Sequence, residues 1–229
     1  MTAVSPPLNL LALAPILVTL TTALAVLLGD LWLRDKQLLV YLALAGVLLA
    51  GLVSLILWGQ APLTFHNMAV SDRLALFFNF IFVMAASLGI LLAADYLRAK
   101  GLQRGEYYAL LLFATSGMMF LAVAADLIII FLGLEIMSVS LYILVGFNRR
   151  QLVSVEAAMK YFILGAFASA FFLYGVALTY GATGTTHLER VGSWLTRSVA
   201  THDPVALIGL GLLLIGFAFK VAAVPFQWW

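Results

Sequence analysis

Long apolar runs recur along the chain between short polar breaks, without alternation of apolar and polar positions. A helix needs roughly 20 residues to cross a hydrocarbon core of about 30 Å, whereas a membrane β-strand shows about 10 alternating residues. Seven runs approach the helical length, at approximately 8–29, 38–58, 74–96, 107–124, 126–147, 155–180 and 204–226. The pattern therefore predicts an all-α, polytopic transmembrane helix bundle, with residues 1–229 forming a single integral membrane region.

The composition strengthens this prediction. Of the 229 residues, 65% are hydrophobic and only 10% are charged, whereas a soluble domain carries about 25% charged residues. The first apolar run has no Lys or Arg before it and is followed by six further runs. This arrangement favours a first membrane helix that stays in the protein over a cleavable signal peptide.

The basic residues are distributed unequally between alternate loops, seven against three. Cytoplasmic loops retain positive charge, so this bias predicts a non-cytoplasmic N-terminus and cytoplasmic loops after the first, third and fifth helices. The seven are Arg34, Lys36, Arg98, Lys100, Arg104, Arg149 and Arg150, and the three are Arg73, Arg190 and Arg197. The formal net charge of +2 is too small to indicate nucleic-acid binding.

Three ionisable residues inside the predicted spans are the candidate functional residues: Glu135, Lys160 and Lys220. A charge at the bilayer centre costs roughly 2.5 to 3.5 kcal/mol, so such residues indicate function by default. Glu135 lies roughly 13.5 Å along a helix from Asp126, which places it near the middle of the membrane. Lys220 lies five residues before Pro225, which predicts a broken helix in the protein interior or beside water.

Each candidate also has a structural interpretation. Glu135 could be a carboxylate that only holds helices together, with Ser138 and Tyr142 on the same helical stripe as partners for it or for a water molecule. The long side chain of Lys160, near a helix end, could extend to the cytoplasmic interface. The remaining conspicuous polar residues are interpreted as a helix N-cap, Asp126, and as cytoplasmic anchors, Arg149 and Arg150.

An acid and amines inside one bundle can move protons. Burial raises the pKa of a carboxylate and lowers that of a lysine, while pairing opposes both shifts, so a conformational change can alter which group holds a proton. Electron transfer by this chain is disfavoured, because His66, His187 and His202 all fall in loops and there is no cysteine. ATP use is disfavoured because no Gly-x-x-x-x-Gly-Lys-Ser/Thr motif occurs. The residues therefore favour proton translocation, with no cofactor or metal bound by this chain.

Several stretches resemble a known family. They read LEIMSVSLYILVGF at 134–147, EAAMKYFILGAFASAFFLYG at 156–175, YGATGTT at 180–186 and GFAFKVAAVPF at 216–226. Together they are similar to the subunit N family of the proton-pumping NADH:quinone oxidoreductase, respiratory complex I. The resemblance covers about 106–226, and the first three helices match only in hydropathy and position.

The resemblance implies a larger antiporter-like fold of two inverted repeats, each with a discontinuous helix. It implies that Glu135 and Lys220 form the charged pair of a proton half-channel and that Lys160 relays protons from the cytoplasmic side. It also implies that NADH, FMN, the iron–sulfur clusters and the quinone are bound by partner subunits. The expected partners are other membrane subunits of complex I, especially neighbouring antiporter-like and small ones, in the cell inner membrane.

Two departures from the family are visible at the end of the chain. Gln227 stands where the family has a His, seven residues after Lys220, and an amide does not titrate. The chain ends at Trp229, inside the first inverted repeat, so it is expected to be the front portion of a longer gene product.

Two other functions remain as alternatives to a complex I subunit. The chain could be a subunit of a multi-subunit monovalent cation/proton antiporter, whose members share the Glu and Lys positions, although the wording from Tyr161 to Gly175 argues against this. It could also be an inert membrane spacer in which the charges only hold helices together.

Overall fold

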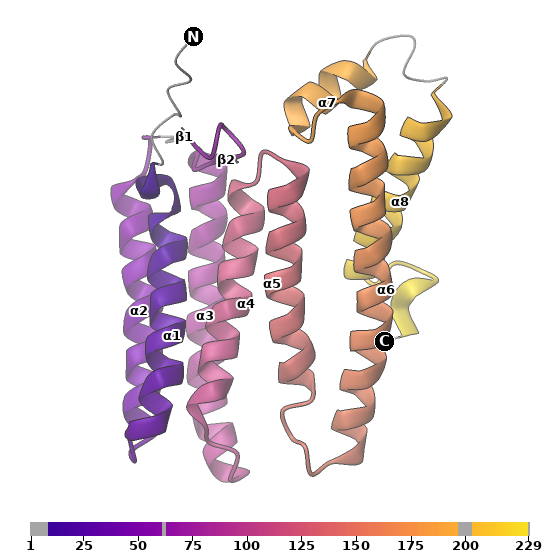
Figure 1. The fold of residues 1–229 in the computed structure, drawn as a ribbon. Coiled ribbons are helices and arrows are strands. Elements are labelled where there is room, and N and C mark those ends of the chain that lie inside the picture. Colours follow the sequence, from indigo (N-terminus) through magenta and orange to yellow (C-terminus); the bar gives the residue numbers. More distant parts are fainter. Residues whose placement is uncertain (1–8, 61–62, 197–202, 229) are drawn as a thin grey trace.

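The chain forms a row of long helices that stand side by side (Figure 1). The computed structural model describes residues 9–60, 63–196 and 203–228. The long helices are α1 (Ala14–Trp32), preceded by the 3-10 turn η1 (Leu10–Leu13), α2 (Gln37–Ile56), α3 (Arg73–Ala99), α4 (Gly105–Val123), α5 (Leu127–Val145), α6 (Leu152–Thr183) and α8 (Pro204–Lys220). The short elements are β1 (Leu63–Thr64), β2 (Ala69–Val70), α7 (Leu188–Leu195) and the 3-10 turn η3 (Phe226–Trp228).

Six of these helices, α1 to α6, are long and apolar enough to cross a membrane in the part of the chain that the structure describes, and α8 is a shorter apolar helix. Large apolar side chains cover the outer surfaces of the bundle; Leu31, Leu92 and Leu152, for example, are 74%, 75% and 80% exposed. Such a surface fits lipid, where apolar side chains lose nothing by facing outward. The predicted all-α transmembrane bundle is confirmed.

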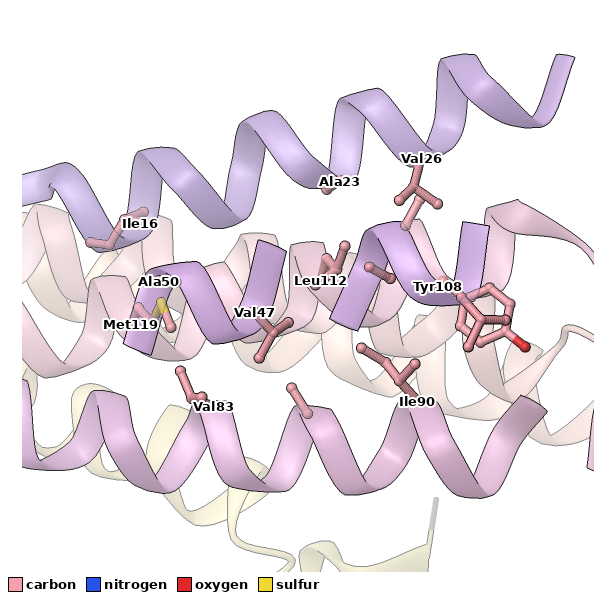
Figure 2. Close-up of a cluster of buried hydrophobic side chains, with 14 of the residues drawn as sticks. Ile16, Ala23, Val26, Val47, Ala50, Val83, Ile90, Tyr108, Leu112 and Met119 are labelled. Carbon is pink, nitrogen blue, oxygen red and sulfur yellow. The ribbon is translucent and has the colours of Figure 1, made fainter. Parts of the chain in front are cut away.

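The first four helices share one packed interior (Figure 2). It is built mainly from small and branched apolar side chains, with Tyr108 and Met119 of α4 among the larger ones, and small residues allow membrane helices to approach closely. The labelled members are Ile16, Ala23 and Val26 of α1, Val47 and Ala50 of α2, Val83 and Ile90 of α3, and Tyr108, Leu112 and Met119 of α4. Helices α1 to α4 therefore form one packed unit, and α5 packs against this unit through its contact with α4.

Glycines bring two pairs of helices into backbone contact. A Cβ added at Gly117 of α4 would lie 2.5 Å from the backbone nitrogen of Met137 in α5. A Cβ added at Gly175 of α6 would lie 2.8 Å from the carbonyl oxygen of Gly209 in α8. Small residues permit such close approach in membrane helices, and it fixes α5 and α8 on the helices beside them.

Three loops are connected by backbone hydrogen bonds at the end of the bundle that is uppermost in Figure 1. The β1–β2 hairpin contacts the α4–α5 link, where the amide of Ala125 donates to Met68 at 2.9 Å. The same link contacts the α6–α7 loop, where the amide of Leu127 donates to Thr186 at 3.0 Å. The predicted role of Asp126 is confirmed, because its carboxylate accepts from the amide of Ile128 at 2.9 Å.

The end of the last helix differs from the prediction. A helix was expected over 204–226, but α8 ends at Lys220. Ala222 adopts a φ of 52°, which does not continue a right-handed helix, and Pro225 has no backbone N–H to donate. The chain therefore turns away after Lys220 and forms η3.

Two short features were not predicted, the β-hairpin and α7. In Figure 1, α7 lies beside the upper end of α6 and runs across the direction of the long helices. Its sequence, LERVGSWL, has Val191 buried and Glu189 and Arg190 exposed. Helix α6 also extends past the predicted 180 to Thr183 and ends at Gly184, whose φ of 71° is the left-handed conformation typical of a helix end.

Candidate functional site

Helices α5, α6 and α8 meet at one packed pocket with three polar side chains: Glu135, Ser169 and Lys220. The rest of its lining is apolar or glycine: Phe131, Leu134, Ala168, Phe172 and Gly216. A carboxylate and an ammonium in such surroundings are stabilised only by specific polar partners. The partners of each group therefore decide what the site can do.

Glu135 points into the bundle from the middle of α5. Its side chain is partly buried, and its carboxylate accepts a hydrogen bond from the hydroxyl of Ser169 in α6. Hydrogen bonds to an ionised carboxylate are stronger than those between neutral groups. Ser169 thus gives the acid a fixed partner on a neighbouring helix.

Lys220 interacts with two hydroxyl groups of α5, those of Ser138 and Tyr142. Its ammonium donates to the hydroxyl of Ser138 and, at 3.3 Å, to the phenol oxygen of Tyr142. The nitrogen also lies 5.5 Å from the centroid of the Tyr142 ring, a cation–π distance. Ser138 and Tyr142 were considered as partners of Glu135 or of a water molecule, but in this structure both interact with the lysine.

The position of Lys220 at the end of α8 is itself favourable. The last carbonyl groups of a helix carry partial negative charge, which stabilises a cation in the last turn. Because α8 ends at Lys220, the partly buried lysine stands in the last turn, where the helix dipole favours a cation.

Glu135 and Lys220 share the pocket but do not form an ion pair. The three ion pairs in the described residues are Asp30–Lys36, Arg104–Glu106 and Glu156–Lys160. Ser138 lies three residues after Glu135 on α5, so the partner of the lysine and the acid are neighbours on one helix face. The hydroxyl partner of the lysine and the acid therefore line the same part of α5.

Lys160 is not brought to this pocket. Its ammonium lies 2.5 Å from a carboxylate oxygen of Glu156, one turn earlier on α6, and their side chains are 59% and 57% exposed. This geometry agrees with the alternative in which the lysine extends toward the end of the helix. Of the three predicted residues, the structure places Glu135 and Lys220 together and Lys160 apart.

Ser169 and Gly165 are site residues that sequence reasoning missed. A Cβ added at Gly165 would lie 2.0 Å from the phenol oxygen of Tyr142, so this glycine provides the space for the phenol. The two residues are four apart on α6 and face the same side. Their spacing was the available signal, although it does not reveal which residues of α5 they face.

Within the described residues no group of three or more His, Cys, Asp or Glu side chains could hold a metal ion. The chemistry available from these groups is proton binding and release by a carboxylate and an amine. An acid and a lysine in the interior of an apolar helix bundle are typical of ion-translocating membrane proteins.

Comparison with known proteins agrees with this class. Residues 124–229 match the family model described as NADH:quinone oxidoreductase/Mrp antiporter, transmembrane. The chain is 46% identical to NADH-quinone oxidoreductase subunit N of Chloroflexus aggregans, over 98% of this chain and 47% of that protein. It is 43% identical to the protein of the same name from Trichlorobacter lovleyi, over 96% of this chain and 46% of that protein.

Solved structures show the same arrangement. A chain of respiratory complex I from Thermus thermophilus superposes with a TM-score of 0.78 at 32% identity, over 94% of this chain and 45% of that one. A chain of the Mrp complex from Dietzia shares the fold with a TM-score of 0.73 at 21% identity, over 96% of this chain and 42% of that one.

The resemblance inferred from the sequence is confirmed, but its expected limit to about 106–226 is wrong, because the match to the subunit N proteins extends over 96 to 98% of this chain and includes the first helices. The chain is homologous over nearly its whole length to NADH-quinone oxidoreductase subunit N proteins, and residues 124–229 carry the transmembrane domain that complex I shares with Mrp antiporters. The chain spans about half the length of the curated relatives it matches.

Proposed function

We propose that this chain is a proton-translocating membrane subunit of an NADH:quinone oxidoreductase. The observation that carries the proposal is the pocket shared by Glu135 and Lys220, in which each charge has its own hydroxyl partner on a different helix. The names of the relatives support the choice of complex. In this proposal the chain binds no cofactor, and NADH, FMN, the iron–sulfur clusters and the quinone belong to partner subunits.

The proposed mechanism is an exchange of partners by Lys220. While the ammonium is held by Ser138 and Tyr142, it does not neutralise Glu135. Movement of the ammonium to Glu135 favours the charged form of both groups, and separation favours release of the proton from the lysine and uptake by the acid. A conformational change in the complex that moves α8 relative to α5 therefore moves a proton.

The role of Lys160 as a proton relay rests on the resemblance and on its place near the start of α6. Its ion pair with Glu156 leaves it at the end of the helix, from which a proton could pass toward the pocket. Gln227 takes no part in this relay, because an amide does not titrate.

The expected location is the cell inner membrane, in contact with neighbouring antiporter-like and small membrane subunits of the complex. The N-terminus is proposed to be non-cytoplasmic, on the basis of the seven-to-three distribution of basic residues. This orientation places the loops after α1, α3 and α5 in the cytoplasm.

The test is NADH-driven proton uptake by proteoliposomes that contain the assembled complex, followed with a pH-sensitive dye. Glu135→Gln is expected to lower the number of protons moved per NADH oxidised. The matched control is Glu189→Gln, because Glu189 is an exposed acid on α7. Equal stoichiometry in the Glu135 variant and the wild type would contradict the proposal and favour the inert-spacer interpretation.

The antiporter alternative is tested in the same vesicles. If the chain belongs to a monovalent cation/proton antiporter, an imposed sodium gradient should change the internal pH without NADH. A complex I subunit should need NADH and quinone for the pH change. A sodium-driven change that disappears with Glu135→Gln would replace the proposed function by the alternative.

A further inference from the structure

Four cationic side chains line one concave surface between the α3–α4 and α5–α6 loops. These two loops are at the lower end of the bundle in Figure 1. The cavity has a volume of about 510 Å³. Its cations are Lys100, Arg104, Arg149 and Arg150. Asn148 and Gln151 add neutral hydrogen-bonding groups to the same wall. We call this surface the basic groove.

The positive charge of the basic groove is almost unopposed. In the described ranges, Lys100, Arg149 and Arg150 form no ion pair, and Arg104 reaches Glu106 only at 3.9 Å, with side chains 61% and 45% exposed. An exposed ion pair of this kind contributes little. Four cations held around one cavity repel one another, so an anion is the natural occupant.

The basic groove lies at the level where the membrane helices begin and end. Helix α4 starts at Gly105, α5 ends at Val145 and α6 starts at Leu152, each within a few positions of the cations. The side chains of Leu152 and Val153 are 80% and 78% exposed and therefore fit lipid directly beside the groove. The anion-binding groups thus lie at the depth of lipid headgroups.

A second, smaller cavity continues from the basic groove between α4 and α5. It shares Arg104, Phe147 and Arg149 with the groove and is also lined by Glu106, Leu110, Ile143 and Gly146. Its volume of about 40 Å³ is too small for an acyl chain, and Glu106 adds a carboxylate to its wall. The apolar surface that suits an acyl chain is therefore the outer face of α6 beside the groove, where Leu152 and Val153 are exposed.

We propose that the basic groove binds the phosphate headgroup of an anionic phospholipid, with an acyl chain along the exposed side chains of Leu152 and Val153. Guanidinium groups bind phosphate oxygens in a bidentate manner, and basic pockets between membrane helices are suited to anionic headgroups. Free phosphate offers the same head chemistry, but the exposed apolar side chains of Leu152 and Val153 beside the groove favour the lipid. The inference uses neither Glu135 nor Lys220 and does not depend on the proposed function.

The first experiment uses the intact wild-type complex. It is incubated with a photoreactive phosphatidylglycerol that carries a diazirine near the headgroup, and the crosslinked peptides are mapped by mass spectrometry. We expect crosslinks in 100–104 and 147–151, competed by unlabelled phosphatidylglycerol but not by phosphatidylcholine or inorganic phosphate. Competition by inorganic phosphate as strong as that by the lipid would overturn the lipid in favour of a soluble anion. The absence of crosslinks in both loops would also contradict the proposal. That result is expected if an acidic segment of another subunit covers the groove instead of a lipid.

The second experiment compares two variants of equal charge. Arg149→Gln with Arg150→Gln is expected to lower the apparent affinity for phosphatidylglycerol about 30-fold, as two juxtamembrane charges contribute at an anionic surface. The control, Arg34→Gln with Arg190→Gln, removes the same charge outside the groove and should change the affinity little. If both double variants lowered the affinity for phosphatidylglycerol equally, the basic groove would not be the binding site. If the Arg149→Gln and Arg150→Gln variant does not assemble, the crosslinking of the wild-type complex tests the proposal alone.

Discussion

The ammonium of Lys220, in the last turn of α8, donates a hydrogen bond to the hydroxyl of Ser138 in the middle of α5. Ser138 is fully buried and in turn donates to the carbonyl of Leu134 on its own helix. The lysine is thus attached to α5 beside Glu135 without being paired to it. This relationship gives a specific prediction for each group around it.

Ser138→Ala should leave Lys220 with Tyr142 as its hydroxyl partner. Hydrogen bonds to charged groups contribute about 1.5 to 3 kcal/mol, so the lysine should lose its fixed position and proton stoichiometry should fall, with the complex still assembled. The matched control is Ser140→Ala, since Ser140 donates to the carbonyl of Ile136. Protons moved per NADH oxidised should fall only in the first variant, and an unchanged ratio would mean that Ser138 does not hold the lysine in the working protein.

Lys220→Arg should keep the charge and pump poorly, because a guanidinium does not deprotonate in the working range of pH. Assembly is expected to be normal, since the positive charge beside Ser138 remains. Pumping is measured in proteoliposomes beside quinone reduction. Pumping by the arginine variant at the wild-type stoichiometry would show that deprotonation at position 220 is not required.

The double variant Glu135→Ala with Lys220→Ala should pump little worse than either single variant, because residues that act as a unit are not additive. Removing one of them also leaves the other as the only charged group that lines the pocket, and an unbalanced charge in apolar surroundings is unfavourable. The double variant should therefore assemble at least as well as either single one. If pumping in the double variant fell by the product of the factors measured for the two single variants, Glu135 and Lys220 would have independent roles.

Gly175→Ala should separate α6 from α8. The added methyl group would meet backbone atoms of Gly209 and Leu213 at 2.8 Å, and overpacking of this kind costs about 1 to 3 kcal/mol. The control on the same helix is Gly181→Ala, which has nothing within 4 Å. We expect a lower dissociation temperature for the subunit in the first variant only, and equal temperatures would show that the close backbone approach is absent.

Single cysteines placed at Ala99 and Ser193 test the orientation. The chain has no cysteine of its own, and both positions are exposed, at the end of α3 and in α7. An impermeant maleimide should label Ala99→Cys only from the cytoplasmic side and Ser193→Cys only from the other side. Labelling of both from one side would contradict the orientation.

The sequence predicted the helices because length and hydropathy decide whether a segment can cross a bilayer. It predicted a break near Lys220 from Pro225 but not its exact place, because the helix ends where Ala222 adopts a φ of 52°, which hydropathy does not reveal. It missed α7, although the amphipathic pattern of LERVGSWL was a usable signal.

The candidate site was predicted in part. Glu135 and Lys220 were found because a charge among apolar residues is visible in the sequence. Ser169 was not identified from the sequence, because serine is common in membrane helices and its role depends on which helix it faces. The structure also assigned Ser138 and Tyr142 to the lysine, which requires the packing of α5 against α8.

The number of protons moved per NADH oxidised by assembled complex with Lys220→Ala tests the central claim most directly. It is measured in proteoliposomes with a pH-sensitive dye while NADH oxidation is recorded, and Lys160→Ala is measured in parallel. The account predicts a strongly reduced ratio for Lys220→Ala at normal assembly. A wild-type ratio in that variant would contradict it and leave the pocket of Glu135, Ser169 and Lys220 with a structural role alone.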